Sequence, residues 1–158
     1  MSLRHQVERS FQRVVQAIPG LPPVNVYRGG DFHGHQAPCV VCWCKGGREE
    51  PKGSGNRLCD VTIIIKSHAL EDEKGDGTDL NPIALIENLS TTVFNALKVG
   101  DINLANDPDS LAAMLSQTGG LYVFHPVIET GYDPDLADVS FVDTLTFQVY
   151  CCEEEVTP

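Results

Sequence analysis

The stretch that decides the fold is LCDVTIIIK, residues 58–66. Every second residue in it is apolar, and these residues share one face of an extended chain: Cys59, Val61, Ile63 and Ile65. The other face is more polar and includes Asp60, Thr62 and Lys66. Alternation with a period of two, in a segment rich in β-branched residues, predicts a strand with one buried face.

The segment before it, residues 39–45, is also rich in β-forming residues, and both of its faces are apolar. Such a strand is expected in the middle of a sheet, with Trp43 as an anchor in the core. Residues 46–57 are glycine-rich and charged, which predicts an unusually long loop. We therefore expect strands 39–45 and 58–66 to pair antiparallel, with the loop projecting beyond the edge of the sheet.

Two long helices flank these strands in the chain. Residues 4–18 carry an apolar stripe at helical spacing, made of Val7, Phe11, Val14 and Ile18. The opposite side of this helix is expected to be polar: Arg4, Glu8, Arg9, Gln12 and Arg13. Residues 82–98 carry a second stripe behind an asparagine cap and a proline in the first turn. Residues 107–117 predict a short third helix.

The remaining strands are expected at 24–27, 121–129 and 140–152, with a turn rich in aspartate at 132–138. Pro126 interrupts the strand at 121–129, so that strand is expected near an edge. The order of elements predicts an α+β fold. It is a two-layer sandwich, with a mostly antiparallel sheet of about five strands and two main helices on one face.

Length and charge limit the class of protein. A chain of 158 residues is expected to form a single domain, 1–158. Residues 1–3 resemble a scar from an expression vector, and 153–158 are expected to be a flexible acidic tail. The net charge of −11 argues against binding to nucleic acid or to an anionic membrane. No apolar run approaches the roughly 20 residues that a membrane-spanning helix needs.

Six cysteines invite a metal interpretation, at positions 39, 42, 44, 59, 151 and 152. Tetrahedral zinc needs four ligands that converge. On a strand, however, Cys39 points away from Cys42 and Cys44, and no second cysteine pair follows at the spacing of a zinc ribbon. We expect these cysteines to act as small core hydrophobes, with zinc as the minor alternative.

Two other segments contain possible metal ligands. His33 and His35 lie among glycines, and a solvated loop is the expected interpretation there. The acidic loop 72–79 has the glycine of a calcium loop, but Ile83 stands where the bidentate glutamate belongs. Weak binding of a divalent ion by Asp72, Asp76 and Asp79 stays open as an alternative. No cofactor is expected.

The sequence gives no support for an enzyme. The segment Lys52-Gly53-Ser54-Gly55 lacks the flanking strand and helix of a nucleophile elbow. Glycine patterns that cradle phosphates are absent from the sequence. A structural or binding role is therefore expected in place of catalysis.

The pattern of elements resembles that of the tail-terminator and minor tail proteins of long-tailed bacteriophages. The resemblance rests on the helix with Val7, Phe11 and Val14, the long loop 46–57, the helix with Ile83, Ile86, Leu89, Val93 and Leu97, and the final strand at 143–150. It covers nearly the whole chain as a pattern, without a diagnostic motif. The segment 107–117 and the cysteine-rich strand are departures from that pattern.

The resemblance implies a subunit of a closed ring, commonly a hexamer, that caps the tail tube where it joins the head. Its partners would be copies of itself and other tail or neck proteins, in the virion tail or, during assembly, in the host bacterial cytoplasm. An acidic lumen would repel the phosphates of passing DNA. The expected contact loop carries mixed charge, with Arg48, Glu49, Glu50, Lys52 and Arg57.

Two alternatives to this assembly role stay open. The loop 46–57 is equally well a surface loop without a partner. The chain as a whole is alternatively a small metal- or ligand-binding domain that uses His33, His35 and the cysteines, or the acidic loop 72–79.

Overall fold

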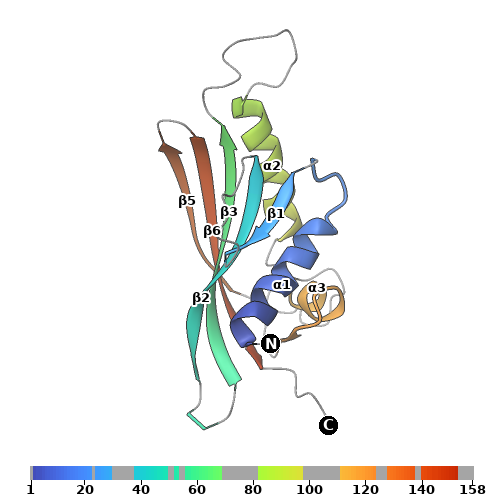
Figure 1. Ribbon diagram of the computed structural model, residues 1–158, viewed down its shortest axis with the longest axis vertical. Helices are drawn as coiled ribbons and strands as arrows, with labels where there is room; N and C mark the ends of the chain where they lie inside the picture. Colours follow the sequence, from blue (N-terminus) through green and yellow to red (C-terminus); the bar gives the residue numbers. More distant parts are fainter. Residues whose placement is uncertain are drawn as a thin grey trace.

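A computed structural model shows one mixed β-sheet with helices packed on one of its faces (Figure 1). The structure describes residues 2–22, 24–29, 38–49, 52–53, 56–68, 82–97, 111–123, 128–137 and 140–152. Of residues 67, 68, 82–87, 122, 128–137, 140 and 141 it describes the backbone alone.

The sheet is built around the strand that the sequence marks most clearly. This strand, β3 (Asn56–His68), pairs antiparallel with β2 (Cys39–Glu49) on one side and with β6 (Ser140–Cys152) on the other. β1 (Asn25–Arg28) pairs with β2 in the parallel direction. β4 (Tyr122–Val123) and β5 (Ile128–Ala137) pair with successive parts of β6, along its outer edge. Among the described residues the sheet thus has six strands, and β1 makes it mixed.

The three described helices lie on the same side of the sheet (Figure 1). α1 (Leu3–Gln16) contacts β1 and β2, α2 (Pro82–Ala96) contacts β3 and β6, and α3 (Leu111–Gln117) contacts β4 and α1. Ser2 caps α1 by accepting a hydrogen bond of 3.4 Å from the backbone N–H of His5. The predicted α+β class is confirmed, and the short third helix is present.

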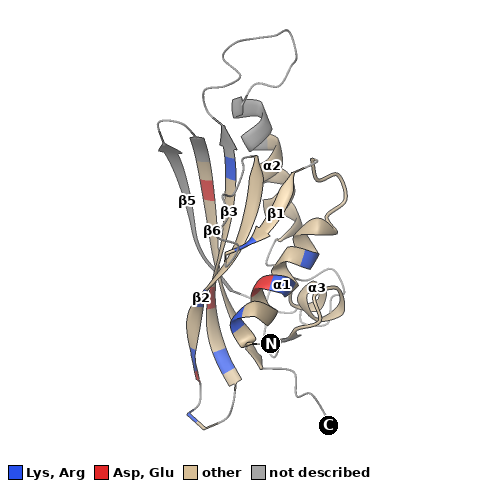
Figure 2. Ribbon diagram, viewed as in Figure 1, with Lys and Arg blue, Asp and Glu red and all other residues tan. Residues whose placement is uncertain are grey.

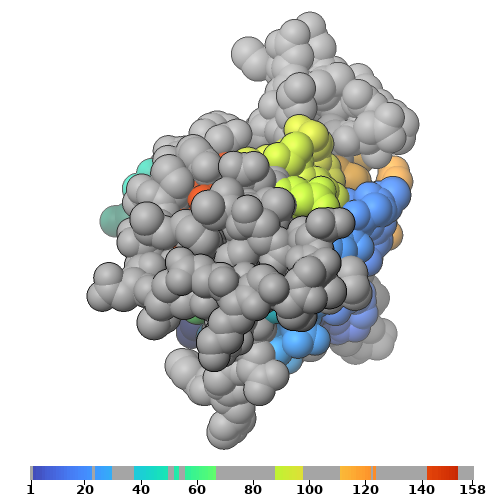
Figure 3. Space-filling model, turned by 90° about the horizontal axis from the view of Figure 1, so that it is seen from above, coloured from blue at the N-terminus to red at the C-terminus, as the bar shows by residue number. Residues whose placement is uncertain are grey.

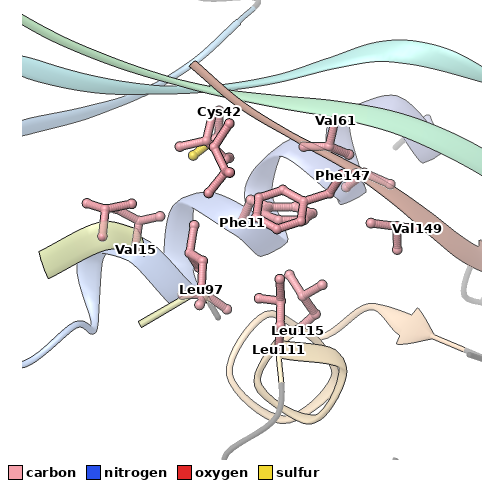
Figure 4. Close-up of a cluster of buried hydrophobic side chains, with 14 of the residues drawn as sticks. Phe11, Val15, Cys42, Val61, Leu97, Leu111, Leu115, Phe147 and Val149 are labelled. Atoms are coloured by element: carbon pink, nitrogen blue, oxygen red, sulfur yellow. The ribbon is translucent and has the colours of Figure 1, made fainter. Parts of the chain in front are cut away.

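The hydrophobic core fills the space between the helices and the sheet (Figure 4). Phe11 from α1 faces Phe147 from β6, with 5.9 Å between the ring centroids. Leu111 and Leu115 close the core from α3, and Leu97 enters it just after α2. Seen from above, the described part of α2 lies next to the N-terminal part of the chain (Figure 3). On α2, Ser90 donates a hydrogen bond of 2.5 Å to the carboxylate of Asp143 on β6.

One predicted turn is wrong. Residues 132–138 were expected to turn because of their aspartates, but residues up to Ala137 belong to β5, which pairs with β6 as far as Ala137 opposite Ser140. Pro134 is tolerated because β5 pairs with β6 on one side alone among the described strands. The hydrogen bonds that hold this strand come from β6, so the local composition could not reveal them.

Candidate interaction surface

Trp43 on β2 lies on the face of the sheet opposite the helices. Among the described residues it is a large hydrophobic side chain that is exposed to solvent. Its side chain is 37% exposed, so the prediction that Trp43 anchors the core is wrong. The residues on either side of it, Cys42 and Cys44, point into the core instead. Strand alternation therefore turns Trp43 to the face of the sheet opposite the core, the face on which Cys39 and Val41 of the same strand are nevertheless buried. The ammonium group of Lys45 lies 5.3 Å from the centroid of the Trp43 ring.

Trp43 lies over Gly29, the residue that follows β1. A Cβ atom at position 29 would be 2.4 Å from Cδ1 of Trp43, so a larger residue there would displace the ring. The backbone N–H of Gly29 donates a hydrogen bond of 2.8 Å to the carbonyl of Cys42. This bond fixes the end of β1 beneath the aromatic ring.

Residues 46–49 and 56–57 extend the sheet, so the prediction that all of 46–57 forms a long loop is wrong at both ends. β2 continues to Glu49 and β3 begins at Asn56, so strand pairing reaches Glu49 opposite Arg57. The register shifts between Cys44 and Gly46, where a β-bulge adds one residue to β2. Gly46 has φ of 124°, a backbone conformation that favours glycine.

The charged residues expected on the loop are distributed over this β2–β3 hairpin. Arg48 lies opposite Leu58, and Arg57 and Lys52 are exposed. Glu49 is partly buried and accepts a hydrogen bond from the backbone N–H of Gly53, which closes the turn. Glu50 lies outside the described residues. The role of these five residues in contacts between copies stays a prediction.

A cavity of about 250 Å³ lies beside the bulge. It is lined by Lys45, Gly46, Gly47, Arg48, Leu58, Asp60 and Gln148. The amide of Gln148 on β6 donates a hydrogen bond of 3.5 Å to the carboxylate of Asp60 on β3. The cavity therefore combines two exposed cationic side chains with a carboxylate that already has a donor.

The sequence interpretation missed this cavity. It placed Lys45 at the end of a strand and Gln148 on another strand, and no local pattern joins them. The one available signal was the pair Gly46-Gly47 after a strand pattern, since glycine inside a strand often marks a bulge. Gly47 is required by packing, because a Cβ there would lie 2.6 Å from the carbonyl oxygen of Leu58.

Helix α1 supports this part of β2 with a buried carboxylate. The side chain of Glu8 is 1% exposed, so the prediction that Glu8 lies on the polar side of the helix is wrong. Its Oε2 accepts a hydrogen bond of 3.0 Å from the backbone N–H of Cys44 and lies 3.8 Å from Nε of Arg4. β1 pairs with β2 only as far as Cys42. Glu8 therefore accepts a hydrogen bond from an amide of β2, that of Cys44, which lies beyond the end of this pairing.

The cysteines occupy the sheet as core residues, as predicted, except that Cys152 is partly exposed. Sγ of Cys59 lies 3.9 Å from Sγ of Cys151 on the neighbouring strand. The hydrogen bond with Cys151 raises the pKa of Cys59 to about 12. Burial raises the pKa of Cys42, and the hydrogen bond to Cys59 raises that of Cys44. Buried neutral thiols of this kind are poor nucleophiles.

The described part of the chain contains no group of three or more His, Cys, Asp or Glu side chains placed to hold a metal ion. The other candidate ligands, His33, His35, Asp72, Asp76 and Asp79, lie outside the described residues. In the part of the chain that the structure describes, no helix is both long and apolar enough to span a membrane.

Comparison with known proteins adds no relative. The sequence matches none of the protein-family models against which it was scanned, and it matches no curated protein sequence.

Proposed function

We propose that this chain is a structural subunit that works by assembling with copies of itself into a ring. The ring would terminate a bacteriophage or prophage tail at the junction between head and tail. Neighbouring tail or neck proteins would be its other partners, in the virion or in the host bacterial cytoplasm during assembly. The chain would act through shape and contact, without catalysis.

The observation that carries this proposal is the unequal use of the two faces of the sheet. All three described helices pack on one face. The other face carries Trp43, Lys45 and a cavity that continues onto the β2–β3 hairpin. Tryptophan and arginine are enriched at protein–protein contact surfaces, so an exposed tryptophan on the same strand as Arg48 favours a role of this face in contacts between proteins. The order of helix, strands, helices and strands supports the resemblance to tail terminators.

The extended hairpin favours contact between copies. Its second strand, β3, is held in register by β6 along its whole length, from Asn56 opposite Cys152 to His68 opposite Ser140. A rigid element of this kind loses little conformational entropy when it docks on a neighbour. A head-to-tail arrangement of such contacts closes into a ring when the rotation between subunits permits it.

Light scattering coupled to gel filtration tests the proposal, followed by electron microscopy of the assembled fraction. We expect a defined oligomer that appears as a ring with a central opening, and binding of this ring at one end of purified tail tubes. A protein that stays monomeric up to high concentration, with and without divalent cations, would rule the ring out.

A further inference from the structure

The face of the sheet opposite the helices carries the side chains of β2 and β3 that alternate with core residues. On β3 these are, in chain order, Asp60, Thr62, Ile64 and Lys66, because the residues between them belong to the core. Asp60 is exposed, Ile64 and Lys66 are partly exposed, and Thr62 is buried. The described helices pack on the other side of the sheet, so we call this side the open face.

The order of charges on the open face of β3 becomes its own complement when the strand is reversed. Asp60 and Lys66 lie equally far on either side of Ile63, about 20 Å apart along the strand. Figure 2 shows a basic segment on the upper part of β3, the part that contains Lys66. If two copies stack by their open faces with their β3 strands antiparallel, Asp60 of each copy meets Lys66 of the other. We propose that the open face binds a second copy of this chain in this way, about a twofold axis that crosses the strands at Ile63.

The charges distinguish this axis from the other twofold arrangement of two stacked sheets. An axis along the strands would set Asp60 against Asp60 and Lys66 against Lys66, and like charges across an interface are unfavourable. An axis across the strands sets opposite charges together at both ends, because an isologous contact repeats every pair. Stacked sheets lie about 10 Å apart, a gap that the long lysine stem and the aspartate span together. A closed ring needs head-to-tail contacts, so this isologous contact goes beyond the proposed function.

Asp60 can form such a pair although it already has one donor. The amide of Gln148 on β6 donates a hydrogen bond of 3.5 Å to its carboxylate. Asp60 is exposed, and an ionised carboxylate accepts hydrogen bonds at about four positions. Gln148 therefore orients this carboxylate on the open face without saturating it.

The same axis matches a prominent side chain with a low one on β2. The axis crosses β2 at Cys42, since Cys42 lies opposite Ile63. It therefore sets Trp43, which is 37% exposed, over Val41 of the second copy, which is 2% exposed. The projecting ring of each copy meets a flat part of the other. Tryptophan in the centre of a contact is a frequent source of binding energy.

The match continues on the two strands beside β2. On β3 the axis sets the partly exposed Ile64 over the buried Thr62 of the second copy. On β6 it crosses at Leu145, which lies opposite Ile63, so Thr144 meets Thr146. Aligned sheets stack with about 30° between their strand directions, so the match is closest near the axis, where these residues lie.

Exchange of the two charges tests the contact by sedimentation velocity. Asp60→Lys and Lys66→Asp each put like charges at both ends of the contact. Each variant alone should self-associate about tenfold or more weakly than the wild type, because two ion pairs are lost at once. The double variant Asp60→Lys/Lys66→Asp restores opposite charges in reversed order and should associate within about threefold of the wild type. A double variant as weak as the two single variants would overturn the proposal.

A mixture of the two single variants gives a sharper result. In a mixed pair every lysine at these positions faces an aspartate, so the equimolar mixture should form heterodimers although each variant alone does not pair. The controls Asn88→Lys/Asn95→Lys and Asn88→Asp/Asn95→Asp change the net charge by the same amounts at exposed positions on α2. Both controls should associate like the wild type. Equal association of all these proteins, or a mixture of folded variants that stays monomeric, would contradict the inference.

The fluorescence of Trp43 reports on the contact without any substitution. Trp43 is the only tryptophan of the chain and lies on the open face. Association through this face covers its ring, so the emission should move to shorter wavelength in step with the rise in mass. Asp60→Lys should keep the emission of the single copy at concentrations where the wild type is associated. An assembly that forms without a change in emission would show that the contact lies elsewhere, and the inference would fail.

The outcomes separate this inference from the proposed function. Rings that form in every variant, with unchanged emission of Trp43, would refute the twofold contact and leave the ring intact. Dimers that respond to the charge variants as expected, without rings at any concentration, would support the twofold contact and refute the ring. A wild-type protein that stays monomeric up to high concentration would refute both.

Discussion

Substitution of Glu8 is the most direct test of how α1 supports the hairpin. Glu8 is completely buried, and its Oε2 accepts the backbone N–H of Cys44 at 3.0 Å. Its Oε1 is buried without a hydrogen-bond partner among the described residues. Glu8→Ala removes the acceptor and leaves the amide of Cys44 buried and unsatisfied.

The magnitude follows from three contributions. Loss of a hydrogen bond to a charged acceptor costs about 1.5–3 kcal/mol. Loss of buried methylene groups costs about 0.8 kcal/mol each. Removal of a buried carboxylate with one unsatisfied oxygen offsets part of this cost. We expect the free energy of unfolding to fall by about 2–3 kcal/mol, which lowers Tm by about 5–10 °C for a chain of this size.

The assay combines urea unfolding with amide hydrogen exchange. Trp43 is the only tryptophan of the chain and lies beside Cys44, so its fluorescence reports unfolding of this strand. Glu8→Gln keeps an oxygen acceptor and should lose about 1 kcal/mol, and Arg4→Ala should lose less than about 0.5 kcal/mol because Arg4 is half-exposed. A Glu8→Ala variant with wild-type stability, in which the amide of Cys44 stays protected from exchange, would refute the support that we assign to Glu8.

Three further predictions concern packing and the thiols. Gly119→Ala should destabilise the protein by about 1–3 kcal/mol, because the new Cβ would lie 2.0 Å from Oγ of Ser10 and 2.5 Å from the carbonyl oxygen of Leu115. Thermal unfolding measures the loss of stability, and adding Ser10→Ala should restore only part of the lost stability. Stability should fall as pH rises from about 9 to about 12, because the buried thiols, Cys59 among them, keep their protons in the folded protein and lose them in the unfolded chain. Cys59→Ala should reduce this pH dependence, and urea titrations at each pH measure it. A thiol reagent at neutral pH should label Cys152 first and the buried cysteines only after unfolding, and rapid labelling of several cysteines would contradict the packing described here.

Much of the secondary structure follows from hydrophobic periodicity. The last strand, predicted at 140–152, spans those residues in the structure, and the helix predicted at 4–18 is α1 (Leu3–Gln16). Segments of this kind carry their own signal, since one face is apolar at the period of the element. The burial of Cys42 and Cys44 on the helix side of β2 follows from the same alternation.

The residues of the candidate interaction surface could not be predicted from hydrophobic periodicity. The cavity joins Lys45, Asp60 and Gln148, which lie far apart in sequence and meet through the pairing of β2 with β3 and of β3 with β6. The exposure of Trp43 depends on which face of the sheet the helices cover. The burial of Glu8 depends on where β1 ends. Because the pairing with β1 stops at Cys42, the amide of Cys44 needs another acceptor, and Glu8 supplies it.

Taken alone, the sequence determined the α+β class, the strand at 58–66 and the burial of five of the six cysteines, because alternating apolar residues select one buried face wherever they occur. Only the tertiary structure decided that 46–49 and 132–137 extend as strands, since their hydrogen bonds are supplied by β3 and β6 and outweigh the local preference of glycine and aspartate for turns.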